Sequence, residues 1–200
     1  GLGVVYAAFD PRLQRTVALK VLRSEVARHD AARLLAEARA MAKLSHPNVC
    51  AVLDVGAIEG RWFLAMALLE GGTLAAWLDA QPRPRAAILQ RFTEAARGLV
   101  AVHGVGVIHR DFKPRNVLLD AHGTAQVSDF GLSAELREST LAHGGTPHYM
   151  APEQREGGGD ARADQYAFGI ALGDALRGHA LPRWLRELIA RCTATDPTAR

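Results

Sequence analysis

The sequence predicts an α+β chain in which a small β-rich part with one helix precedes a mainly helical part. Up to about residue 67, β-branched and aromatic residues alternate with turn residues, as in hairpins. After Gly71-Gly72, apolar residues recur three and four positions apart, which is the period of helices with one buried face. The 200 residues, 48% of them hydrophobic, suffice for one domain or two small lobes around a buried core.

Each element of the first part has a local signal. Apolar runs on both sides of the turn DPRLQR predict a hairpin, and Glu59-Gly60 predicts the turn of a second hairpin. Apolar residues at helical spacing, ending at Ser45-His46-Pro47, predict a helix between the hairpins. The expected elements are strands 4–10 and 16–22, a helix over 30–44, and strands 49–58 and 61–68.

The second part contains a concentrated run of polar chemistry. Helices are expected over 73–80, 85–104 and 180–194, with short strands near 117–120 and 125–129. The stretch IHRDFKPRN, residues 108–116, lies between the long helix and the first of these strands. It therefore forms a loop held by rigid elements, where catalytic groups are commonly placed.

Composition and charge exclude several classes of protein. The net charge is +3 and the pI about 9.2, but the arginines are scattered among acidic residues without interleaved aromatic residues, so no nucleic-acid partner is expected. Apolar runs break before the roughly 18 residues of a membrane helix and no leader opens the chain, which predicts a cytoplasmic chain without a membrane segment. Cys50 and Cys192 lack metal-binding spacing and are expected to be reduced.

Lysine is rare, because the 24 cationic residues include only Lys20, Lys43 and Lys113. The chain uses arginine wherever either cation would serve, so a retained lysine indicates a need for a compact ammonium, such as a phosphate contact. Lys20 follows three apolar residues of a predicted strand, and Lys113 lies in the polar loop. Both are therefore candidate phosphate-binding residues.

These motifs resemble, in order and spacing, those of the eukaryotic-type (Hanks-type) Ser/Thr protein kinases. The matching segments are VALK at 17–20, Glu37, HRDFKPRN at 109–116, DFG at 129–131 and APE at 151–153. The resemblance implies a two-lobed protein kinase-like fold. Its expected parts are an N-lobe over 1–67 that lacks its first strand, a hinge over 68–71, and a C-lobe over 72–200 that is shortened after residue 180.

The resemblance assigns the polar loop to phosphoryl transfer from ATP. It implies that Asp111 accepts the proton of the substrate hydroxyl and that Lys113 neutralises the γ-phosphate. Asn116 and Asp129 are the implied ligands of Mg²⁺, with Mn²⁺ as an alternative, since both offer oxygen atoms. On sequence alone, Asp111 could instead cap a turn and Asn116 could be an ordinary hydrogen-bonding loop residue.

Further ATP contacts follow from the resemblance. Lys20 would reach the α and β phosphates, aimed by an ion pair with Glu37. The local sequence of Glu37 favours a solvated helix charge paired with Arg33, but its spacing from Ser45-His46-Pro47-Asn48 favours the ion pair with Lys20. Met66 resembles the gatekeeper of the nucleotide pocket, and the segment from Ala67 to Leu69 resembles the hinge that pairs with the base edge. The remaining ATP-binding candidates are Gly3, Val5, Ala18 and Leu118, and those that are apolar could equally be core residues.

Other positions match structural and regulatory residues of the family. Met41, Val52, His109 and Phe130 are expected to form an apolar stack, with His109 structural rather than a general base. Asp164 would tether the backbone of the catalytic loop, and Glu153 would pair with Arg200. Lys113-Pro114 and Thr146 indicate serine or threonine as the acceptor. Arg110 suggests regulation by phosphorylation of the activation segment, at the candidate sites Ser139 and Thr140.

Departures from the family pattern leave other readings open. The phosphate-covering glycine loop is matched only at its end by Gly3 and Val5, and a substrate-docking segment is missing after residue 180. The pattern predicts a piece truncated at both ends, similar to bacterial members. An active Ser/Thr kinase in signalling is expected. The alternatives are a catalytically impaired kinase-like (pseudokinase) binding module and a basic nucleic-acid-binding domain.

Overall fold

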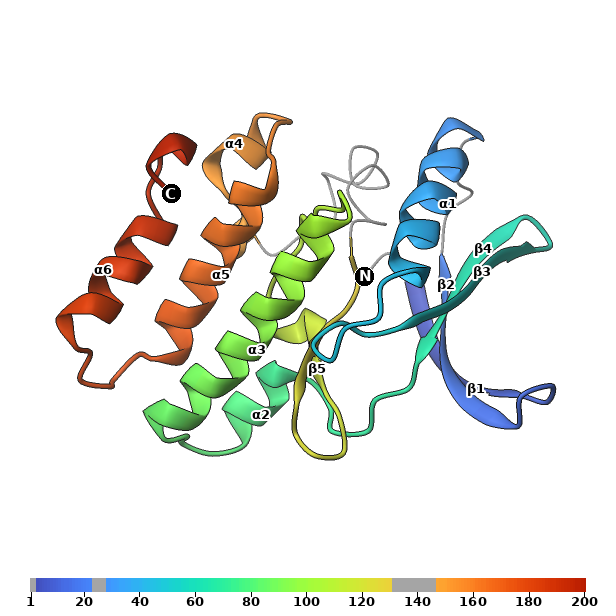
Figure 1. Cartoon of the computed structure of the whole chain (residues 1–200), viewed down its shortest axis with the longest axis horizontal. Coiled ribbons are helices and arrows are strands. Elements are labelled where there is room, and N and C mark those ends of the chain that lie inside the picture. Colours follow the sequence, from blue (N-terminus) through green and yellow to red (C-terminus); the bar gives the residue numbers. More distant parts are fainter. Residues whose placement is uncertain (1–2, 23–27, 131–146) are drawn as a thin grey trace.

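The computed structural model of the chain describes residues 3–22, 28–130 and 147–200 (Figure 1). Its first part is a four-stranded antiparallel sheet in the order β1-β2-β4-β3. The strands are β1 (Gly3–Asp10), β2 (Arg15–Leu22), β3 (Val52–Ile58) and β4 (Arg61–Ala67). Both predicted hairpins are therefore confirmed, each within a few residues of its expected bounds.

The two hairpin turns follow from local chemistry. Between β1 and β2, the Asp10 carboxylate accepts hydrogen bonds from the backbone N–H groups of Arg12 and Leu13, at 3.0 and 3.2 Å. Between β3 and β4, Glu59 and Gly60 both have positive φ, 51° and 77°. Positive φ at both central residues is the conformation that matches the twist of a two-residue hairpin.

Helix α1 (Arg28–Ala42) packs against β3. Its buried residues Leu34, Ala38 and Met41 lie on one face at helical spacing. In Figure 1 the helix stands between the sheet and the helices of the second part. The predicted helix over 30–44 is thus confirmed, with both of its ends two residues earlier.

The second part is mainly helical and holds a small two-stranded hairpin next to two of its helices (Figure 1). Its helices are α2 (Leu74–Ala80), α3 (Arg85–Gly104), α4 (Pro152–Arg155), α5 (Ala161–Ala175) and α6 (Arg183–Cys192), and its strands are β5 (Val117–Leu119) and β6 (Ala125–Val127). The Thr73 hydroxyl caps the start of α2, accepting from Ala76 N at 3.0 Å, and Asp160 caps α5 in the same way through Arg162 N at 2.8 Å.

One hydrophobic core joins the two parts, because buried residues of the sheet and α1 belong to the same cluster as those of the helical part. Phe92 on α3 and Phe112 after it both pack against Phe168 on α5, with ring centroids 5.6 and 5.7 Å apart. Gly98 allows the close approach of α3 to the segment before β3, since an added Cβ would overlap the carbonyl oxygen of Asn48. Within the described ranges, no helix combines the length and hydropathy that a membrane span requires.

Candidate active site

The polar loop 108–116 lies between α3 and β5 and is held by one buried carboxylate. Asp164 on α5 is 1% exposed and accepts hydrogen bonds from His109 N at 2.8 Å and Arg110 N at 2.7 Å. Its Oδ2 also lies 2.8 Å from Nε2 of His103 on α3. Three elements thus meet at Asp164, which ties the loop backbone to two helices.

Arg110 is held from its other side as well. Its φ is 62°, in the left-handed region that costs energy for a residue with a side chain. The Gln154 side chain donates to the Arg110 carbonyl at 3.1 Å and accepts from Ala151 N at 3.1 Å. Asp164 and Gln154 together therefore maintain a strained backbone conformation immediately before Asp111.

The side chains of the loop converge on Asp111. Lys113 Nζ lies 2.9 and 3.1 Å from its two carboxylate oxygens. Asn116 Nδ2 donates to the Asp111 carbonyl at 2.8 Å and to Oδ2 at 3.2 Å. The amide nitrogen of Asn116 makes both of these bonds, so its amide oxygen remains for another partner.

Asp129 and Lys20 face each other across the site. Lys20 Nζ lies 2.6 Å from Asp129 Oδ1, and the two side chains are 12% and 30% exposed. Asp129 has a φ of 60°, and Ser128 beside it bonds through both its N–H and its hydroxyl to the Asn116 carbonyl, at 2.9 and 3.0 Å. The first part therefore supplies the Lys20 ammonium, and the segment after β6 brings the Asp129 carboxylate close to Asn116.

The sequence predicts that Lys20 pairs with Glu37. The Lys20 ammonium forms an ion pair with Asp129, and Glu37 lies half-buried on α1. The Lys20–Glu37 pair remains a prediction.

His109 lies in an aromatic cluster. Its side chain is fully buried, 5.9 Å from the Phe112 ring in an edge-on arrangement and 5.4 Å from the Phe130 ring. Nδ1 accepts from Asp111 N at 3.3 Å, and Nε2 has no hydrogen-bond partner among the described residues. Met41 and Val52 are also buried. This environment gives His109 a packing role in the loop.

The predicted ATP-binding residues Val5, Ala18, Lys20 and Met66 share one face of the four-stranded sheet. Directly paired residues of antiparallel strands lie on the same face, and Val5 pairs with Lys20 while Ala18 pairs with Met66. Ala18 and Lys20 lie two apart on β2 and so share a face, which places all four of these residues on the same face of the sheet. Ala18 and Met66 are 8% and 6% exposed, whereas Val5 is 55% exposed.

Gly3 has a structural explanation of its own. An added Cβ at this position would come within 2.5 Å of the Val21 carbonyl oxygen on β2. Close pairing of the two strands therefore calls for glycine here whether or not a ligand is bound.

The chain between β4 and α2 is pinned to β5. Gly71 N donates to Leu119 O at 2.9 Å, and Leu119 N donates to Gly72 O at 2.8 Å. Leu118 forms an isolated bridge with Thr73 and therefore lies beside this connection. Among the described residues the backbone of Leu69 has no hydrogen-bond partner, which leaves its N–H and C=O for a ligand.

A bidentate ion pair anchors the end of the second part. The Arg200 side chain is fully buried and contacts both Glu153 oxygens, at 2.5 and 2.9 Å. Burial alone would raise the pKa of Glu153, but the hydrogen bonds from Arg200 outweigh it and lower the pKa. This pair ties α4, which carries Gln154, to the segment after α6.

Some predicted residues lie outside the described ranges, namely Ser139, Thr140 and Thr146. Other residues at the site were not anticipated from the sequence. His103 and Gln154 contact Asp164 and Arg110, which are 61 and 44 positions away along the chain. No local pattern marks such residues, since only the packing of α3, α4 and α5 brings them to the loop.

Cys50 lies next to the end of β6, where its N–H donates to the Val127 carbonyl oxygen. Its side chain is buried, 1% exposed, with the sulfur 3.6 Å from the Ala67 carbonyl oxygen. Burial and the nearby charge of Asp129 raise the pKa of its thiol to about 12. The thiol is therefore uncharged at neutral pH and takes no part as a nucleophile.

Comparison with known proteins agrees with this geometry. The family model described as "Protein kinase domain" matches residues 1–184. Three bacterial relatives are similar over most of the chain. The DNA damage-responsive serine/threonine-protein kinase RqkA of Deinococcus radiodurans is 46% identical over 183 residues, which cover 86% of this chain and 27% of that protein. The serine/threonine-protein kinase PknL of Mycobacterium tuberculosis is 38% identical over 187 residues, which cover 90% of this chain and 47% of that protein. The serine/threonine-protein kinase PrkC of Bacillus subtilis is 34% identical over 189 residues, which cover 89% of this chain and 29% of that protein.

The chain spans less than half the length of each of these relatives. The family model nevertheless covers nearly all of its residues, and the two-part architecture with a small antiparallel sheet and a helical second part is that of a protein kinase. The chain belongs to the protein kinase domain family.

Proposed function

We propose that this chain is the catalytic domain of a serine/threonine protein kinase, which transfers the γ-phosphoryl group of ATP to a protein hydroxyl. One observation carries the proposal: Asp111, Lys113 and Asn116 converge within hydrogen-bond distance, beside Lys20 and Asp129. Phosphoryl transfer depends mainly on positioning and charge neutralisation, and this cluster offers a base, two ammonium groups and oxygen ligands.

In the proposed reaction Asp111 accepts the proton of the attacking serine or threonine hydroxyl. The oxygen of that hydroxyl forms a bond to the γ-phosphorus, the bond between this phosphorus and the oxygen bridging to the β-phosphate breaks, and ADP leaves. Lys113, which contacts Asp111, would neutralise charge on the transferred group. Asn116 holds the Asp111 carboxylate in position through its amide nitrogen.

A divalent ion fits the oxygen atoms that remain. No group of three or more His, Cys, Asp or Glu side chains in the described ranges could hold a metal by itself. Mg²⁺ is commonly held by one or two protein oxygens together with substrate phosphates, and Asp129 with the amide oxygen of Asn116 supplies two. An ion bound there would neutralise charge on the phosphates. We propose Mg²⁺, with Mn²⁺ as an alternative.

Lys20 would contact the α and β phosphates and Glu37 would orient it. Val5 and Ala18 would cover one side of the adenine and Leu118 the other, next to Met66. Ala67 and Leu69 would pair with the base edge, and Gly3 would approach the phosphates.

The proposed lobes are residues 1–67 and 72–200, joined by a hinge over 68–71. This arrangement puts the nucleotide between the sheet and the catalytic loop. ATP as the donor points to action in the cytoplasm.

The acceptor class rests on Lys113-Pro114 and on the similarity to relatives that are named serine/threonine-protein kinases. Arg110 would pair with a phosphate on Ser139 or Thr140, and Thr146 would bond toward Asp111 and Lys113.

The test is transfer of labelled γ-phosphate from ATP, with Mg²⁺, to a generic basic protein by the full-length protein. We expect label on serine or threonine and a loss of about 10²-fold or more in Asp111→Asn, because removal of a general base commonly costs that much. Asp54→Asn, at an exposed position of β3, makes the same chemical change away from the site and should keep its activity. Undiminished transfer by Asp111→Asn would overturn the role of Asp111. Absence of transfer with ATP binding intact would identify a kinase-like binding module.

A further inference from the structure

Two amide side chains hold the peptide groups on either side of Asp111. After Asp111, Asn116 Nδ2 donates to the Asp111 carbonyl at 2.8 Å. Before it, Gln154 Nε2 donates to the Arg110 carbonyl at 3.1 Å. The proposed reaction gives a role to Asn116 but none to Gln154, which reaches the loop from α4. The peptide group that Gln154 holds ends at the backbone nitrogen of Asp111, so its orientation sets the direction in which the Asp111 side chain points.

This peptide group lies in a strained part of the backbone. The φ of Arg110 is 62°, which is unfavourable for a residue with a side chain. Asp164 holds the N–H of Arg110, at 2.7 Å. Rotation about the N–Cα bond of Arg110 would relieve the strain, and it would move the carbonyl while leaving the N–H on Asp164. The bond from Gln154 opposes this rotation.

The other end of the same peptide group is held weakly. Asp111 N donates to His109 Nδ1 at 3.3 Å, which is at the long end of the hydrogen-bond range. The 3.1 Å bond from Gln154 to the Arg110 carbonyl is shorter. Rotation of the peptide group would break the bond to His109 as well, so the contact of Gln154 also protects the amide of Asp111.

Both ends of the Gln154 amide are used. The oxygen accepts from Ala151 N at 3.1 Å, and the nitrogen donates to a carbonyl oxygen. One partner can only donate and the other can only accept, so a single orientation of the amide satisfies both. A glutamate here would keep the bond from Ala151 but would have no donor for the carbonyl, and a methionine would make neither bond.

Helix α4 presents Gln154 from a fixed position. Its residue Glu153 pairs with the buried Arg200 side chain, at 2.5 and 2.9 Å. On the other side of Gln154, Arg155 Nη2 donates to the Pro147 carbonyl at 3.1 Å. Because both neighbours of Gln154 in the chain are anchored, its amide can hold the loop rather than follow it.

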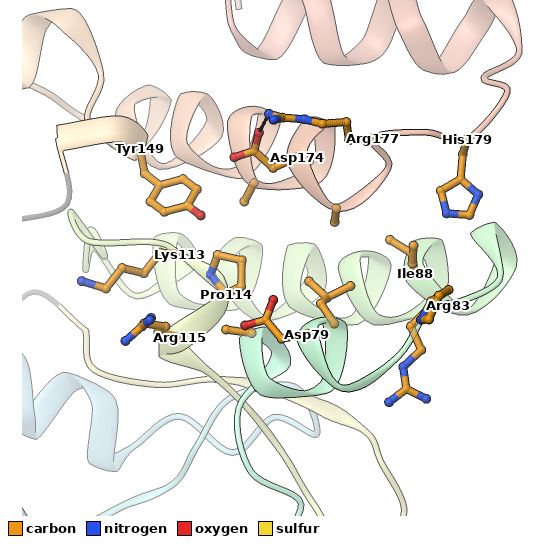
Figure 2. Close-up of a pocket in the computed structure, with 15 residues that line it drawn as sticks. Asp79, Arg83, Ile88, Lys113, Pro114, Arg115, Tyr149, Asp174, Arg177 and His179 are labelled. Atoms are coloured by element: carbon orange, nitrogen blue, oxygen red, sulfur yellow. Dashed lines mark hydrogen bonds and ion pairs between the residues drawn. The ribbon is translucent and has the colours of Figure 1, made fainter.

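The segment before α4 lies against the catalytic loop. It packs on α5, and in Figure 2 its Tyr149 ring lies between α5 and Lys113 of the loop. The cavity that remains between Arg110, Met150 and Gln154 has about 10 Å³, roughly the room of one water molecule. An informative substitution of Gln154 therefore keeps its volume, because a smaller side chain would admit water that could replace the amide.

We propose that Gln154 is a positioning residue for Asp111, which holds the peptide group before the base in the orientation that phosphoryl transfer needs. The inference rests on the proposed kinase activity and adds to it a residue outside the catalytic loop. Asp111 acts in the chemical step, whereas the proposed contacts to the nucleotide come from other residues. Loss of the Gln154 bond should therefore slow transfer and leave the affinity for ATP as it is.

The first measurement is the single-turnover rate of phosphoryl transfer from ATP, with Mg²⁺, to a generic basic protein by the full-length protein. A single turnover separates the chemical step from product release. We expect a loss of about tenfold or more in Gln154→Glu and in Gln154→Met with an unchanged KM for ATP, because small misplacements of reacting groups are that costly. Gln81→Glu makes the same chemical change at an exposed position after α2 and should keep the rate.

The second measurement is hydrogen exchange of the same variants, resolved to single amides by mass spectrometry. In Gln154→Glu, exchange should become about three- to tenfold faster at Asp111, the scale of one neutral hydrogen bond. It should not become faster at Ala151, which keeps its acceptor. In Gln154→Met both amides should exchange faster.

An unchanged transfer rate in Gln154→Met would overturn the inference, since any loss in Gln154→Glu would then come from the added charge. Unchanged exchange at Asp111 in both variants would overturn it as well. A failure of the kinase proposal looks different, because the unmodified protein would then transfer no phosphate, while the exchange measurement would still report on the Gln154 contact.

Discussion

The ion pair between Arg200 and Glu153 offers the strongest test of how the second part is held together. Arg200 is fully buried and makes both contacts to Glu153. It also donates to the carbonyl oxygens of Ala194, Arg162 and Thr195, at 2.8, 3.1 and 3.2 Å. Replacing it by methionine in Arg200→Met keeps much of the volume but leaves the Glu153 carboxylate and these carbonyl groups without their donor.

Breaking a buried pair by removing one partner costs about 3–5 kcal/mol of unfolding free energy. For a domain of this size each kcal/mol shifts Tm by roughly 2–4 °C, so Tm should fall by roughly 10 °C. The assays are urea unfolding for the free energy and thermal unfolding for Tm, both followed by tryptophan fluorescence. Arg183→Met is the matched control, because Arg183 is 87% exposed and its 2.6 Å pair with Glu187 should contribute only about 0.3–0.5 kcal/mol.

The effect should depend on pH in a defined direction. Arg200 lowers the pKa of Glu153 in the folded protein below its unfolded value of about 4.3, so the contribution of the pair is complete above that pH. It is lost as the pH falls through the lower folded pKa, and the difference between the unmodified protein and Arg200→Met should shrink there. An Arg200→Met variant that unfolds at the same urea concentration as Arg183→Met would refute this reasoning.

Three further predictions follow from single contacts. Asp164→Asn replaces a carboxylate that accepts from two backbone N–H groups, so it should lower the unfolding free energy by about 2–4 kcal/mol in urea titrations. It should also speed hydrogen exchange at the amides of His109 and Arg110, and unchanged exchange would show that Asp164 does not hold the loop backbone. Gly98→Ala should destabilise by about 1–3 kcal/mol in the same titrations despite the higher helix propensity of alanine, because the added Cβ overlaps a backbone carbonyl; a gain in stability would show that α3 can move away. The Cys50 thiol, with its pKa raised to about 12 by burial, should not react with a thiol reagent at pH 8 in a Cys192→Ser background until urea unfolds the protein, and reaction in the folded state would contradict its burial.

Local elements were predictable because their signals lie in neighbouring residues. The helix over 85–104 was predicted with the bounds that α3 has, from the period of its apolar residues. The turn at Glu59-Gly60 was predicted from its residue types, and both residues have the positive φ that such a turn requires.

The candidate site was only partly predictable. The spacing of Asp111, Lys113 and Asn116 implied a shared loop, and these residues do contact one another. The contact of Lys20 with Asp129, at 2.6 Å, was not anticipated, because it depends on how the sheet and the segment after β6 pack, and no pattern within the strand of Lys20 indicates this. The pairing of Lys20 with Glu37 stays a prediction.

The family is evident from the sequence, because the order and spacing of short motifs are properties of the chain alone. The role of Asp164 in holding the loop backbone, with His103 as its third partner, is evident only from the folded structure. The same holds for Gln154, which reaches the Arg110 carbonyl from α4. The reason is physical: periodicity and turn chemistry act between neighbouring residues, whereas contacts between distant segments form only when the whole core packs.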